Sequence, residues 1–150
     1  MKLSLGIAIV VALLLGGIWW SSDRTERDPD VVARNGLHAH PELAIYVKGV
    51  RQEIPANIGI GVEYSSISGF DQSMQMAPIH THEDLPLIHL EFAGGVVRRG
   101  DITLGQFFRV WGRDMRGFGA DMRMTVNGVE NTEYENYVME DKDRIELRFN

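Results

Sequence analysis

The chain has 150 residues, contains no cysteine and carries a formal net charge of −6. Without cysteine it can form no disulfide, carry out no thiol redox chemistry and build no cysteine-ligated blue copper centre. The negative charge argues against nucleic acid as a partner, and a chain of this length suits one small domain.

Residues 3–20 form an uncharged, apolar run that follows Lys2 and ends at Trp19 and Trp20. Its length is near the minimum for a membrane-spanning helix, and a tryptophan pair suits the membrane–water interface. A cleaved signal peptide is the alternative, but the bulky tryptophans leave no obvious small-residue cleavage site. We therefore expect residues 1–21 to be a transmembrane anchor, or an uncleaved signal. The rest of this single-pass cell-membrane protein would be extracytoplasmic, because positive charge ahead of the helix stays inside.

Residues 22–36 are polar and mixed in charge, which is typical of a tether. We expect them to be a linker between the anchor and one domain that occupies residues 37–150. Within that domain, the glycines and serines of residues 56–77 predict a long loop. No internal repeat or low-complexity tract divides the chain.

Period-two alternation of apolar residues predicts the strands of this domain. A strand that carries Leu43, Ile45 and Val47, followed by a turn and a return strand, predicts a hairpin. His38 and His40 continue the alternation of that strand on the face opposite its apolar row. Further strands are expected over residues 87–92, 122–126 and 144–149.

Between these strands, one segment predicts a short amphipathic helix. Thr103 as N-cap and Gln106 three residues later form a capping box. Apolar residues from Leu104 to Trp111 then recur at i, i+3, i+4 and i+7, and Gly112 is placed to end the helix. One helix among several strands indicates an α+β fold.

All five histidines fall in two short stretches of the chain, and each belongs to a pair with one residue between its members. In an extended segment, side chains two apart point the same way, so each pair shares a face. Three such pairs brought together would form a nitrogen-rich metal site assisted by a carboxylate. The candidate ligands are His38, His40, His80, His82, His89 and Glu91.

Imidazole ligands with one carboxylate fit copper first and zinc second, and copper is handled outside the cytoplasm. Met74 and Met76 lie just before the second histidine stretch, and thioether sulfur prefers Cu(I); their alternative role is ordinary packing. Glu91 could bind the ion or fix the tautomer of His89. Glu83 and Asp84 are expected to stay solvated. Five histidines exceed the usual three or four ligands, so some could serve a second ion, a transfer step or nothing.

The last third of the chain resembles the end of a β-grasp domain of the ubiquitin-like or transcobalamin-C-terminal-like type. The resemblance lies in Thr-Leu-Gly-Gln-Phe-Phe at residues 103–108, Met-Thr-Val-Asn-Gly at 124–128, and residues 137–147 with their Asp-x-Asp-Arg-Ile motif. In that fold one helix packs across a mixed sheet, and a final strand follows an acidic turn. The resemblance implies a β-grasp-like domain, here preceded by a single transmembrane helix.

The exported part also resembles a family of small membrane-anchored, histidine-rich extracytoplasmic proteins of bacteria and archaea. Shared features are an early His-x-His, a second histidine-rich stretch, a Thr-Leu-Gly-x-Phe-Phe helix and a closing Asn-Gly…Asp-x-Asp-Arg-Ile segment. They stand here at residues 38–40, 80–89, 103–108 and 127–145. The resemblance implies an exported domain and metal binding, and it implies no particular activity.

These patterns leave three hypotheses for function. The first is a membrane-anchored metal-binding protein, copper before zinc, that buffers or delivers the ion to or from a donor or acceptor protein. The second is a metalloenzyme with three histidines on one ion and an open position for water or oxygen. The third is a non-catalytic envelope interaction or assembly module, which predicts scattered histidines. Neither a Gly-x-Ser-x-Gly motif, a P-loop nor a complete cupin pattern is present.

Overall fold

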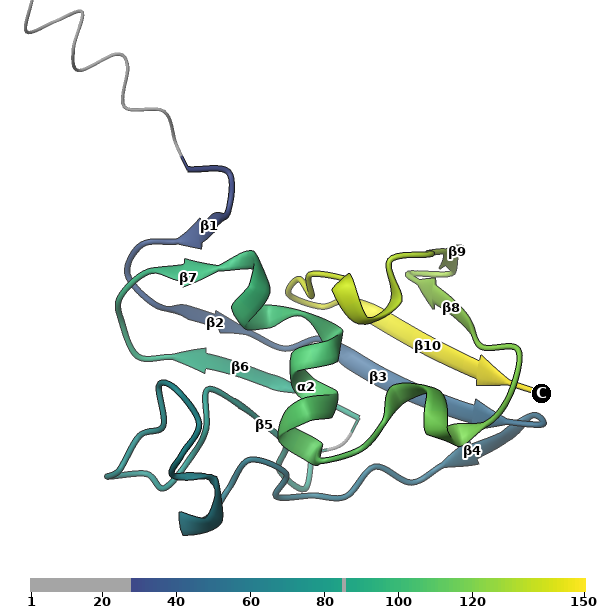
Figure 1. Cartoon of the computed structure of the whole chain (residues 1–150), viewed down its shortest axis with the longest axis horizontal. Coiled ribbons are helices and arrows are strands. Elements are labelled where there is room, and N and C mark those ends of the chain that lie inside the picture. Colours follow the sequence, from purple (N-terminus) through teal and green to yellow (C-terminus); the bar gives the residue numbers. More distant parts are fainter. Residues whose placement is uncertain (1–27, 85) are drawn as a thin grey trace, which may run out of the picture.

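The computed structural model describes residues 28–84 and 86–150 (Figure 1). The transmembrane segment expected over residues 1–21 lies outside them. Within the described ranges, no helix is both long enough and apolar enough to cross a bilayer.

The described residues form ten strands, one α-helix and four short 3-10 helices. The strands are β1 (Val31–Ala33), β2 (Leu37–Ala39), β3 (Glu42–Val47), β4 (Val50–Gln52), β5 (Ile79–His80), β6 (His89–Phe92), β7 (Val97–Arg98), β8 (Arg123–Val126), β9 (Val129–Glu130) and β10 (Arg144–Phe149). The helices are α2 (Leu104–Trp111) and the 3-10 helices Val62–Tyr64, Arg99–Ile102, Met115–Phe118 and Tyr134–Asn136. The mixed α+β class expected from the sequence is confirmed.

The larger sheet is mixed, with five strands in the order β4-β3-β10-β8-β9. The hairpin β3–β4 is antiparallel, whereas β3 and β10 run parallel with Leu43 opposite Ile145. Ile145, Leu147 and Phe149 of β10 are buried, as their alternation predicts. The last strand therefore lies in the middle of the sheet, next to the first strand of the hairpin.

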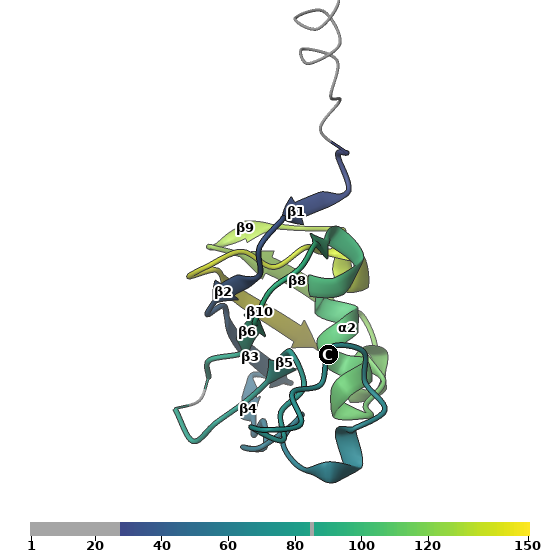
Figure 2. The ribbon, with the colours of Figure 1, turned by 90° about the vertical axis from the view of Figure 1, so that its left-hand side faces the viewer.

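Helix α2 lies across one side of the strands (Figures 1 and 2). It begins and ends where the sequence predicts: the backbone N–H of Gln106 donates to the Thr103 hydroxyl at 3.2 Å, and Gly112 is left-handed with φ 71°. Leu104 and Phe107 are completely buried against the core. The segment 56–77, predicted to be a long loop, forms turns around one 3-10 helix.

A second, three-stranded sheet has the order β2-β6-β5. The stretch from Leu37 to Val47 was expected to be one alternating strand, and here the expectation is wrong. The chain leaves the smaller sheet after β2 and enters the larger one at β3, on either side of Pro41. Proline has no N–H to donate to a ladder, so a strand is readily interrupted there.

Part of the segment expected to be a linker forms a strand of the domain. Strand β1 pairs antiparallel with β7. The Arg98 guanidinium of β7 donates to the carboxylates of Asp28 and Asp30, at 2.9 and 3.1 Å. These contacts attach at least residues 28–33 to the domain.

The turn before β10 is organised by one buried carboxylate. Asp143 accepts hydrogen bonds from the Tyr137 hydroxyl at 2.6 Å, the Asn127 side-chain amide at 3.0 Å and the Glu140 backbone N–H at 2.8 Å. Burial, together with the hydrogen bond to Asp143, raises the pKa of Tyr137 far above its ordinary value. The hydroxyl therefore stays protonated in the folded protein at pH values where it ionises in the unfolded chain.

This difference predicts a loss of stability in alkali. Below about pH 10 the tyrosine is protonated in both states, and its contribution is fully present. Above that pH the unfolded chain releases the proton and the folded chain keeps it, so the free energy of unfolding falls by up to about 1.4 kcal/mol per pH unit. Denaturant unfolding of wild type and Tyr137→Phe between pH 8 and 11 should show a steeper loss in wild type. Tyr46→Phe is the matched control; equal slopes for all three proteins would contradict the prediction.

Candidate metal centre

The register of the smaller sheet brings distant histidines together. His80 of β5 lies opposite His89 of β6, and His38 of β2 lies opposite Glu91 of β6. Their neighbours in each strand point to the other face and are buried in the core: Ala39, Ile79 and Leu90. Strand alternation thus separates a core face from a face that carries imidazoles and a carboxylate.

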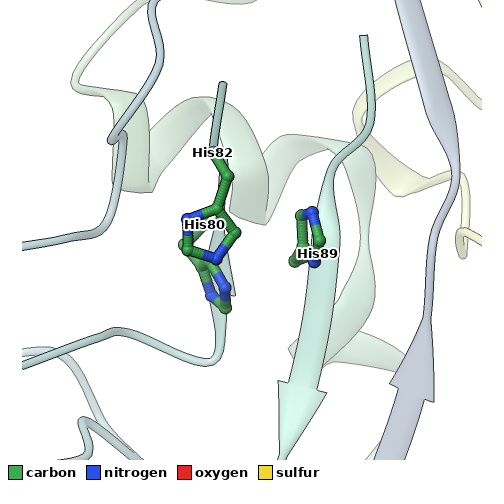
Figure 3. A group of neighbouring side chains, drawn as sticks. All are labelled: His80, His82 and His89. Atoms are coloured by element: carbon green, nitrogen blue, oxygen red, sulfur yellow. The ribbon is translucent and has the colours of Figure 1, made fainter. Parts of the chain in front are cut away.

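Three histidines form an inner cluster of His80, His82 and His89 (Figure 3). Their ring centroids lie 4.8, 5.3 and 4.8 Å apart, and each ring offers a nitrogen within 4.8 Å of the others. His80 is 0% exposed and His89 is 8% exposed. A metal ion is bound by groups at this sort of spacing once small side-chain rotations bring them to bonding distance.

Two of the inner histidines, His80 and His89, are each held through one ring nitrogen. Nδ1 of His80 lies 2.9 Å from the Ala77 carbonyl oxygen, and Nε2 of His89 lies 3.2 Å from both carboxylate oxygens of Asp84. A carbonyl and an ionised carboxylate can only accept, so these two nitrogens carry the protons. The opposite nitrogens, Nε2 of His80 and Nδ1 of His89, are buried and have no hydrogen-bond partner among the described residues.

Burial and charge set the protonation of this cluster. Burial lowers the pKa of His80, although its bond to Ala77 opposes the shift, and so favours the neutral ring. Burial alone would raise the pKa of Asp84 and of Glu91. At Asp84, the hydrogen bond and charge of His89 outweigh burial, and at Glu91 the nearby histidines do so. The pKa of each carboxyl group is therefore lowered. A neutral His80 beside ionised Asp84 and Glu91 is a state that can bind a cation.

A second, outer cluster contains His38, His40 and Glu91. Oε1 of Glu91 lies 3.1 Å from Nε2 of His38 and 3.5 Å from Nδ1 of His89. The rings of His38 and His40 are 4.7 Å apart, and those of His40 and His89 are 4.8 Å apart. The side chains of His38 and His40 are 66% and 36% exposed, so this cluster faces solvent.

Both methionines singled out in the sequence line a pocket beside these clusters. The pocket has a volume of about 240 Å³ and includes Met74, Met76, His38, His80 and Glu91 in its wall. Two methionines and two histidines therefore line one pocket. Met74 is exposed and lies in a turn, so it is a loop residue and not part of the core.

The structure brings all six candidate ligands into one continuous group, and their binding of an ion stays a prediction. The scattered histidines expected of a pure interaction module are not what the described residues show. Asp84 is exposed, as expected, and its carboxylate also contacts His89. Asp141, which accepts from the His40 backbone N–H at 2.9 Å, was missed because it lies 101 residues away and no local pattern links the two.

Together these features define a small α+β domain with histidine groups that could hold a metal ion. Comparisons with protein-family models, curated proteins and solved structures found no match to this chain.

Proposed function

We propose that this domain binds a transition-metal ion through His80, His82 and His89. One observation carries the proposal: the buried nitrogens Nε2 of His80 and Nδ1 of His89 have no hydrogen-bond partner among the described residues, although the other nitrogen of each ring is fixed by an acceptor. Metal-binding histidines have this arrangement, in which a carbonyl or carboxylate orients the ring and the free nitrogen faces the ion. Without an ion, each buried unpaired nitrogen costs free energy.

Copper is the ion favoured by the proposal, with zinc second. Imidazole suits both metals, and the chain has no cysteine to favour zinc thiolate sites. Met74 and Met76 share a pocket with His80. A soft thioether next to imidazole favours Cu(I) over zinc, because sulfur binds the softer ion more strongly.

We further propose that the ion is buffered or delivered outside the cytoplasm, by a domain anchored through residues 1–21. The apolar run and its closing tryptophan pair support the anchor. A β-grasp-like assignment is supported by the helix packed across a mixed sheet and by the last strand, which follows the acidic turn at Asp141-Lys142-Asp143. Delivery requires a donor or acceptor protein, whose ligands would meet the exposed histidines.

A metalloenzyme is the second candidate. The observation in its favour is the pocket beside His80, which could admit a small molecule next to the ion. A copper enzyme would keep a position for an exogenous ligand, so added azide would change the absorption and paramagnetic resonance spectra of the Cu(II) protein. In a carrier, protein ligands would fill every coordination position of the ion, so azide would leave both spectra unchanged.

The proposal is tested by metal retention of the full chain, purified in detergent without a histidine tag and loaded with Cu(II) or Zn(II). Elemental analysis after desalting should give one tightly held ion in wild type and none in the double variant His80→Ala/His82→Ala. Circular dichroism would establish that the variant is folded. Equal retention by wild type and double variant would overturn the proposal.

A milder change tests the same site without altering a ligand. Asp84→Asn removes the charge that fixes the His89 tautomer and should weaken metal binding by about 10- to 100-fold. Glu83→Gln makes a similar charge change at the neighbouring exposed residue and should leave the affinity unchanged. Equal affinities for these two variants in a chelator competition would argue that Asp84 does not orient a metal ligand.

A further inference from the structure

The six candidate ligands differ in how deeply they are buried. His80 is fully buried, His89 nearly so, and His38 and His40 are open to solvent. The inner cluster already offers three imidazoles, which with one further ligand complete the usual coordination of copper or zinc. Glu91, whose Oε1 lies 3.5 Å from Nδ1 of His89, is placed to be that further ligand. The inner ion then does not require His38 or His40.

Glu91 lies between the exposed and the buried histidines. A single oxygen, Oε1, lies 3.1 Å from Nε2 of the exposed His38 and 3.5 Å from Nδ1 of the buried His89. The second of these nitrogens is the one without a hydrogen-bond partner. A carboxylate in this place can bind an ion of the outer cluster while it remains against the inner cluster, as bridging carboxylates do in sites with two ions.

From this geometry we infer that His38, His40 and Glu91 form a second, solvent-facing position for the same type of metal ion, linked to the inner position through Glu91. The inference rests on the proposed function of the inner cluster. The contact of His40 with His89, whose rings are 4.8 Å apart, makes the two positions immediate neighbours. An ion that arrives from solvent or from a partner protein meets the outer position first and the inner position after it.

Charge and exposure set the properties of the outer position. Its histidines are solvated, so an ion bound there exchanges more readily than one bound by buried groups. Two neighbouring cations repel, and the carboxylate of Glu91, with Asp141 held against the backbone of His40, offsets part of that repulsion. The outer ion should therefore bind more weakly than the inner one and depend strongly on the charge of Glu91.

The test is a titration of the full-length protein in detergent with Cu(II) or Zn(II), followed by equilibrium dialysis against the metal alone. Wild type should bind one tight and one weaker equivalent. The double variant His38→Ala/His40→Ala should keep the tight equivalent, with its affinity changed less than threefold, and lose the weaker one. Glu91→Gln should weaken the second equivalent at least tenfold, whereas Glu130→Gln, on the exposed edge strand β9, should not.

The outcomes separate this inference from the proposed function. A single tight equivalent that survives His38→Ala/His40→Ala and is lost in His80→Ala/His82→Ala would overturn the second position and leave the first intact. A single equivalent lost in both double variants would mean one shared ion and would also overturn the second position. Retention of a tight equivalent by His80→Ala/His82→Ala, or the absence of a tight equivalent in wild type, would refute the inner site itself.

For copper, paramagnetic resonance spectroscopy tests whether the two positions are adjacent. Two Cu(II) ions in adjacent sites couple magnetically, so the second equivalent should reduce the paramagnetic signal per ion or split it. His38→Ala/His40→Ala should restore the signal of one isolated ion. A second equivalent that adds an uncoupled signal of full intensity would place it elsewhere on the protein and contradict the inference.

Discussion

Saturation with the cognate metal should raise the free energy of unfolding of this protein by about 2.7 kcal/mol when the free ion stands at a hundred times its dissociation constant. The increment arises because the folded chain holds the inner nitrogens together and the unfolded chain does not. It is a substantial fraction of the roughly 5–15 kcal/mol that keeps a typical domain folded. Denaturant unfolding with and without metal measures it directly.

The His80→Ala variant should lose this increment. Its stability without metal will also change, because a completely buried side chain is removed and a cavity is left. The informative quantity is therefore the difference between the metal-loaded and metal-free stability of each variant, which cancels the cost of the cavity. An increment in His80→Ala equal to that of wild type would show that the ion binds elsewhere.

A matched comparison comes from the exposed histidines. His38→Ala/His40→Ala removes two imidazoles, as does His80→Ala/His82→Ala, but leaves the inner cluster unchanged. It should keep the increment produced by the tightly bound ion. Addition of a chelator should return both wild type and this variant to their metal-free stability, which checks that the effect is reversible binding.

The second large effect is expected at the centre of helix α2. Phe107→Ala should lower the free energy of unfolding by about 3–5 kcal/mol, because the Phe107 side chain is 0% exposed and its removal opens a cavity in the core. Its ring lies 5.6 Å from that of Phe108 and 5.8 Å from that of Trp111, and these contacts are lost as well. Urea unfolding followed by circular dichroism measures the change.

The control for this substitution is Phe107→Leu, which keeps most of the buried volume and should cost clearly less. Since α2 also packs against β5, the strand that carries His80, loss of the phenyl ring should loosen the inner cluster too. Metal affinity should therefore fall in Phe107→Ala and be nearly normal in Phe107→Leu. Similar stabilities for the two variants would show that the ring is not a central part of the core.

Local patterns in the sequence were sufficient to predict several elements. The hairpin β3–β4, the boundaries of α2 and the inward row of β10 follow from interactions between residues a few positions apart. Capping at Thr103 and the left-handed Gly112 are examples. Alternation also paired the histidines correctly where the chain is extended, as in His89 and Glu91.

Other predictions failed because they depended on partners far along the chain. Residues 37–47 alternate throughout, yet β2 and β3 belong to different sheets. The expected linker contributes β1, because Arg98 lies where it can bind Asp28 and Asp30. Hydrophobic period alone does not specify which strands pair, and a one-residue change of register would place the histidines in the core.

By itself, the sequence determined which side chains carry chemistry: five histidines in spaced pairs, a neighbouring Glu91, two methionines and no cysteine. Only the tertiary structure decided how they meet. The registers of β2, β6 and β5 place His80 against His89 and His38 against Glu91, and a turn brings Asp84 to His89. The physical reason is that ligand identity is a local property of the chain. The separation, burial and orientation of ligands are set by strand pairing between segments far apart in the chain, such as β2 and β6, where His38 pairs with Glu91.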